Sequence, residues 1–226
     1  MMMPAGLRKF TFAAHITSSV GWVGAVIVFL ALAVVALTSQ SEMTVRGAYL
    51  VMAPAAWFVL VPLAHASLIS GVALSLGTTW GLVRHYWVVL KLGITVFCTA
   101  ILLIYMGTFR QMASIAADPT MDLQHVRNAS PLLHAVLALM LLLAATWLGV
   151  YKPFGVTPYG SRRMGERLSK SNLSSAAFSR SGGPRTAPTE RVAPGRKELY
   201  LLVGIAGLLL LFLILHIISG GVGGHQ

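Results

Sequence analysis

Residues 10–37 read FTFAAHITSSVGWVGAVIVFLALAVVAL and include no Asp, Glu, Lys or Arg. A helix that crosses the roughly 30 Å hydrocarbon core of a bilayer needs about 20 apolar residues, so this run is long enough to span a membrane with some tilt. A cleaved signal peptide is the rival interpretation, because Arg8 and Lys9 precede the run. The apolar part of a signal peptide is only about 7–15 residues long, which favours a retained span.

Four more apolar runs follow, and each has the length of a membrane span. They are Tyr49–Leu76, Tyr86–Met106, Pro131–Tyr151 and Leu199–Ile218. The whole chain is 56% hydrophobic and only 10% charged, whereas soluble domains carry about 25% charged residues. The sequence therefore predicts an all-α fold, an integral membrane helical bundle with five spans.

The connections divide the chain into three parts. Short loops in residues 1–151 predict a four-span antiparallel core, because short loops favour antiparallel neighbours. Residues 152–198 form a loop rich in Ser, Gly, Pro and Arg, and we expect about 160–194 to lack fixed structure. Residues 199–226 supply the fifth helix and a short tail.

Basic residues are distributed unevenly between the two sides. If the N-terminus is cytoplasmic, the inner segments hold Arg8, Lys9, Arg84 and ten basic residues of the 152–198 loop, and the outer segments hold only Arg46, Arg110 and Arg127. Lys and Arg favour the cytoplasmic side. The sequence thus predicts a bacterial inner-membrane protein with its N-terminus in the cytoplasm and its C-terminus outside.

The formal net charge of +11 has three interpretations. The basic loop is a solvated linker that sets the topology and lies near anionic lipid headgroups, or it is a site for a specific protein partner. Nucleic-acid binding is disfavoured, because no aromatic or folded reader accompanies the charge.

Polar residues on two spans suggest a site in the cytoplasmic half of the bundle. His15, Ser18, Ser19 and Trp22 share one face of the first helix. Lys91 shares a face of the third span with Thr95 and Cys98, and the depths of His15 and Lys91 match. An ionisable residue inside a span is a functional candidate, but helix packing for His15 and snorkelling for Lys91 are equally open interpretations.

Other histidines are weaker candidates. His65 lies near the centre of the second span, close to Pro62, which should interrupt that helix. His134 and His216 have similar depths toward the outer side, which permits an imidazole pair. The single cysteine, Cys98, excludes an intrachain disulfide and a zinc-type cysteine cluster, and we predict no metal-ion site of this kind.

The spacing of His15, Trp22 and Gly24 resembles the first helix of a group of small bacterial membrane proteins. This group includes the copper-resistance protein D family and the J-type protoporphyrinogen oxidases. The stretch SLGTTWGLVRHYWVVLKL at residues 75–92 resembles a related family of predicted integral membrane proteins of unknown function more closely. The resemblance covers about residues 7–151. In the J-type oxidases a first-helix His and a third-helix Lys are linked to haem, and His15 and Lys91 match them.

Two function classes follow. The first is a haem-associated role, in redox chemistry or haem handling, with haem b held by His15 and with Lys91 as a second ligand or a propionate partner. The alternative is a non-enzymatic membrane scaffold or a small transporter. The sequence contains no constellation of catalytic residues that decides whether the protein is an enzyme.

Overall fold

The computed structural model describes residues 3–78, 80–153, 155–166 and 196–221. Five helices in these ranges are long and apolar enough to cross a membrane. They are α1 (Ala5–Thr38), a composite of α2 (Glu42–Ala55), η1 (Ala56–Leu60) and α3 (Val61–Gly77), α4 (Tyr86–Ala117), α5 (Ser130–Tyr151) and α7 (Arg196–Gly221). The predicted all-α membrane bundle is confirmed, and each predicted span lies within one of these helices.

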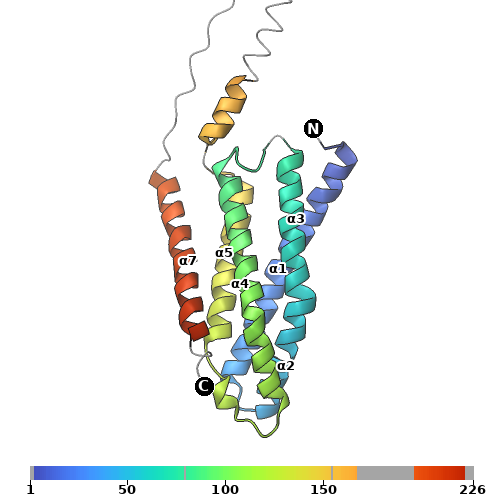
Figure 1. Ribbon diagram of the computed structural model, residues 1–226, viewed down its shortest axis with the longest axis vertical. Helices are drawn as coiled ribbons and strands as arrows, with labels where there is room; N and C mark the ends of the chain where they lie inside the picture. The colour runs from blue at the N-terminus through green and yellow to red at the C-terminus, as the bar shows by residue number, and fades with distance from the viewer. Residues whose placement is uncertain (1–2, 79, 154, 167–195, 222–226) are drawn as a thin grey trace, which may run out of the picture.

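The first four spans form a closed bundle in which successive spans run in opposite directions (Figure 1). α1 packs against α3 and α5, and α4 packs against α2, α3 and α5. The fifth span, α7, packs along the outside of α5. Large side chains such as Trp22, Phe29, Tyr49, Ile94 and Leu141 fill the interior.

The second span is interrupted where the sequence predicts it. Residues Ala56–Leu60 form a π-helical turn, in which the N–H of Val61 donates to the carbonyl of Ala56 five residues earlier. Pro62 follows directly and cannot donate a backbone hydrogen bond. The helix therefore accommodates Pro62 by widening one turn, as π-bulges in longer helices do.

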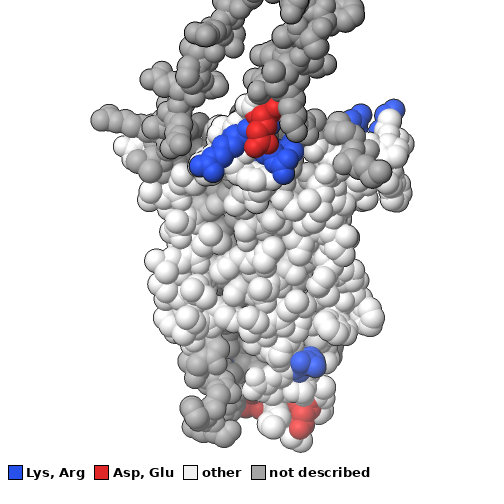
Figure 2. Space-filling view, turned by 45° about the horizontal axis from the view of Figure 1, so that its top comes forward, with Lys and Arg blue, Asp and Glu red and all other residues white. Residues whose placement is uncertain are grey.

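One end of the bundle, here called the basic end, holds Arg8, Lys9, Arg84 and Lys152, and α1 begins there. Figure 2 shows Lys and Arg side chains at this end, a wide belt without charged side chains, and a few charges at the opposite end. A belt of apolar surface between two charged ends is the surface that a bilayer requires.

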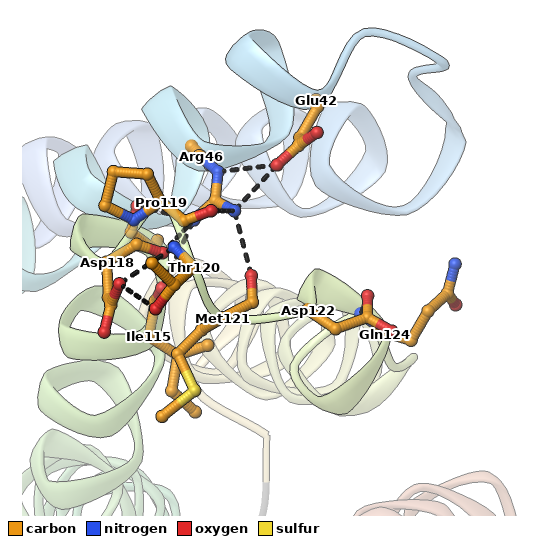
Figure 3. Close-up of polar contacts among 10 residues, drawn as sticks. Glu42, Arg46, Ile115, Asp118, Pro119, Thr120, Met121, Asp122 and Gln124 are labelled. Carbon is orange, nitrogen blue, oxygen red and sulfur yellow. Dashed lines mark hydrogen bonds and ion pairs between the residues drawn. The ribbon is translucent and has the colours of Figure 1, made fainter.

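At the opposite end, two arginines bind helix termini. Arg46 of α2 donates to the carbonyl oxygens of Ala116 (3.2 Å) and Asp118 (2.7 Å) at the end of α4, and it pairs with Glu42 at 2.7 Å (Figure 3). Arg127 similarly donates to the carbonyl oxygen of Leu37 at the end of α1. These side chains satisfy carbonyl groups that a helix end leaves without partners.

At the basic end, residues 158–166 are helical, so the prediction that fixed structure is missing from about residue 160 is wrong for 160–166. The Thr157 side chain accepts a hydrogen bond from the N–H of Gly160 (3.2 Å), and Pro158 occupies the first turn. Thr before a helix and Pro in its first turn are strong start signals, which the overall composition of the loop obscures. The remainder of the predicted loop, 167–195, lies outside the described residues.

Candidate functional site

A cavity of about 540 Å³ lies at the basic end between α1, α3, α4 and α5. Its volume falls within the range of about 300–1,000 Å³ that is usual for small-molecule and cofactor sites. Its wall is mainly apolar and includes Phe12, Leu68, Leu74, Val88 and Leu92. The two residues that the sequence singles out, His15 and Lys91, both line it.

His15 has a fixed orientation in this cavity. Its Nδ1 lies 3.0 Å from the carbonyl oxygen of Ser67 and 3.2 Å from the hydroxyl of Ser70, both on α3. A carbonyl oxygen can only accept, so Nδ1 carries the proton and Nε2 presents its lone pair. In metal-binding histidines, the ring nitrogen that does not bind the metal usually donates to a similar backbone or carboxylate acceptor, which orients the ring.

Lys91 turns toward His15. Its Nζ lies 3.3 Å from Nε2 of His15, so the amine donates to the lone pair of the imidazole. The side chain of Lys91 is half-buried. The contact agrees with the predicted match in depth between His15 and Lys91, and it favours the inward-facing interpretation of Lys91.

Two glycines make room for this pair. A Cβ on Gly71 would lie 3.0 Å from Cε1 of His15, and a Cβ on Gly149 would lie 3.1 Å from Nζ of Lys91. Nothing in the sequence pattern connects either glycine with the site. Small residues at such positions let polar side chains and backbones approach closely inside a membrane bundle.

The cavity is strongly cationic. Arg8, Lys9, Lys91 and Lys152 line it, and among the described lining residues none carries a carboxylate. Cations in a partly apolar site require a compensating anion or water, because their desolvation is otherwise costly. The cavity is therefore suited to an amphiphilic ligand with an acidic group.

The other residues of the predicted polar face, Ser18, Ser19 and Trp22, also face inward. Ser19 and Ser67 share a hydrogen bond of 2.8 Å between their hydroxyls, which joins α1 to α3 beside His15. Ser18 is buried and donates to the carbonyl of Ala14 in its own helix. Trp22 is buried in the core. The predicted polar face of α1 is thus confirmed as an interior face.

His134 and His216, for which the sequence permits an imidazole pair, lie in contact. Nε2 of His134 on α5 lies 3.2 Å from Nδ1 of His216 on α7, and the His134 ring lies against Tyr105 with 4.3 Å between centroids. The adjacent cavity has a volume of only about 60 Å³. It is too small for an organic cofactor, so we interpret this pair as a link between helices.

The remaining candidates do not join the main site. His65 is half-buried, and its Nδ1 lies 2.8 Å from the carbonyl oxygen of Val61 in its own helix. Cys98 is buried and lines the smaller cavity. The described residues include no group of three or more His, Cys, Asp or Glu side chains that could hold a metal ion.

Comparisons with known proteins add no identification. No protein-family model matches the chain, and neither the curated proteins nor the solved structures give a significant match.

Proposed function

We propose that this chain binds haem b in the cavity at the basic end and has a haem-linked redox or haem-handling role. The observation that carries the proposal is the orientation of His15. His15 lines a cavity with a mainly apolar wall, the Ser67 carbonyl fixes its protonated Nδ1, and its Nε2 carries the lone pair, which accepts from Lys91 until a ligand replaces that contact. Imidazole is a common axial ligand of haem iron, and cofactor sites in helix bundles are built from side chains on facing helices.

The other residues of the cavity fit the remaining parts of haem. The apolar wall suits the macrocycle, and the cations suit its two propionates. Lys91 donates to Nε2 of His15, so it would give up this hydrogen bond when iron binds that nitrogen and would then be a second ligand or a propionate partner. Bound haem would supply electron transfer, and the chain would supply the orientation and the exclusion of bulk water.

The resemblance to the J-type oxidases and the copper-resistance protein D group supports the same proposal, because His15 and Lys91 occupy the matching positions. We also propose a location in a bacterial inner membrane with the basic end in the cytoplasm. The uneven distribution of Lys and Arg supports this orientation.

The test is an absorbance spectrum of the protein purified in mild detergent from haem-sufficient cells. We expect a Soret band, and we expect His15→Ala to remove it or to lower haem affinity at least about tenfold, equivalent to about 1.4 kcal/mol. Lys91→Met should reduce haem retention more than it reduces expression. His65→Ala is the matched control, because His65 is a histidine of the neighbouring span that bonds within its own helix.

A colourless wild-type protein, or a Soret band that is indifferent to His15→Ala and Lys91→Met, would contradict the haem proposal. That result would favour the alternative class, a non-enzymatic scaffold or a small transporter.

A further inference from the structure

The backbone of Lys152 has an unusual conformation at the mouth of the cavity. Lys152 ends α5 with φ 47° and ψ 48°, and among the described non-glycine residues it is the one with a positive φ. Its N–H donates to the carbonyl of Leu148 at 3.0 Å. Glycine or asparagine usually occupies this position at a helix end, because a Cβ makes the left-handed conformation unfavourable. A lysine here suggests that its side chain has a role.

Aromatic residues hold that side chain over the cavity. Nζ of Lys152 lies 4.7 Å from the centroid of the Trp80 ring. Trp80 in turn makes an edge contact with Trp87, with 5.5 Å between the centroids. Lys152 and both tryptophans line the cavity. The ammonium group is therefore held at the mouth by a cation–π contact and does not simply extend into water.

Two more cations complete the rim. Arg8 and Lys9 reach the same cavity from α1. They precede His15 by seven and six residues, respectively, which corresponds to about 9–10.5 Å along a helix. The cavity thus has a cationic rim, an apolar wall, and an imidazole about 10 Å deeper. This layering fits an amphiphile whose acidic end lies at the rim.

We propose that Lys152, with Arg8 and Lys9, binds the acidic end of the ligand, namely the propionate carboxylates of haem. The inference rests on the proposed function and refines it, because it assigns the propionates to the rim and leaves Lys91 beside His15. Carboxylates accept charge-assisted hydrogen bonds from such cations. The phosphate of an anionic lipid has the same chemistry, so the experiment must separate the two sources.

The experiment titrates detergent-purified, haem-free protein with haem and with haem dimethyl ester, in which both propionates are neutral. We expect the wild type to bind haem at least about fivefold more tightly than the ester. This factor corresponds to the contribution of one Lys or Arg near an anionic surface. Lys152→Asn tolerates the left-handed backbone but removes the charge, so it should weaken haem binding about fivefold and ester binding less than twofold. Lys152→Arg should retain the preference.

Arg162→Asn is the matched control, because Arg162 is an exposed cation at the same end that does not line the cavity. Equal affinities of the wild type for haem and ester, or an unchanged preference in Lys152→Asn, would overturn the rim assignment alone. Failure of the wild type to bind either compound would overturn the proposed function and the rim assignment with it. Competition by phosphatidylglycerol but not phosphatidylcholine, without preference for haem over its ester, would assign the rim to lipid phosphate and overturn the propionate assignment.

Discussion

At the scale of single residues, the position of the His15 ring depends on the absence of a side chain at Gly71. The α3 backbone approaches α1 closely enough that a methyl group at residue 71 would lie 3.0 Å from Cε1 of His15. The ring cannot retreat freely, because Nδ1 is bonded to Ser67 and Ser70 on the same helix as the glycine. A small substitution should therefore disturb the site without removing any of its polar groups.

We expect Gly71→Ala to destabilise the protein by about 1–3 kcal/mol, the usual cost of overpacking an interior. Gly93→Ala on α4 is the control, because an added Cβ there meets nothing within 4 Å. Ala is the better helix former by up to about 1 kcal/mol, so Gly93→Ala should be neutral or stabilising. Thermal unfolding in detergent, followed by circular dichroism, measures both variants. Equal melting temperatures for the two would show that Gly71 does not constrain His15.

The matching depths of His15 and Lys91 were predictable from the sequence, but their direct contact, the two glycines beside them and the cationic rim of the cavity were not. Residue spacing sets the depth of a side chain in a span, so equal depths permit two side chains to meet, but whether they do depends on which helix faces become neighbours. Gly149 and Lys152 lie at the end of the fourth span, where no periodicity marks them. Their roles depend on which helices become neighbours and on the conformation of one residue, Lys152.

At the scale of elements, predicted spans and observed helices differ because a helix continues beyond the hydrocarbon. The predicted span ends at Met106, but α4 continues to Ala117. Residues 107–117 are too polar to be predicted as part of a span. The carbonyl groups at its end are satisfied by Arg46. Hydropathy locates the apolar segment of a helix, whereas capping side chains determine where the helix ends.

The attachment of α7 to α5 is an element-scale feature with a specific polar contact. Nδ1 of His134 lies 2.8 Å from the carbonyl of Ser130, so Nδ1 carries the proton and Nε2 accepts from His216. Phe212 adds an edge contact with Phe97 of α4 at 5.6 Å. A hydrogen bond between membrane helices contributes on average about 0.6 kcal/mol and at most about 1.7 kcal/mol, so this contact should favour docking without controlling it alone.

We expect His216→Leu to weaken the association of α7 with the four-helix core, because the buried His134 then loses its donor. A specific protease site inserted between residues 175 and 185 allows the chain to be cut, and the fraction of α7 that copurifies with the core measures docking. Ile217→Leu is the control, since Ile217 is exposed on the surface of α7. Equal retention of α7 in the two variants would show that the histidine pair does not hold the helix.

At the scale of the whole molecule, two of the three arginines at the end opposite the basic end have a structural role. Arg46 and Arg127 both bind carbonyl groups at helix ends. Their presence on the minority side of the charge distribution is thus explained by local capping. Bonds to neutral carbonyl groups leave both arginines charged, so the expected orientation rests on the excess of Lys and Arg at the basic end (Figure 2).

The expected topology places the basic end in the cytoplasm, and reporter fusions can measure it. Alkaline phosphatase is active only outside the inner membrane, so a fusion after Gln226 should be active and a fusion at Ser175 should be inactive. Fusions to a fluorescent protein that folds only in the cytoplasm should give the opposite pattern. Because five spans place the two ends of the chain on opposite sides, moving the basic end outward would reverse every reporter at once. Such a reversal would contradict the orientation, and equal activity at both positions would contradict α7 as a fifth span.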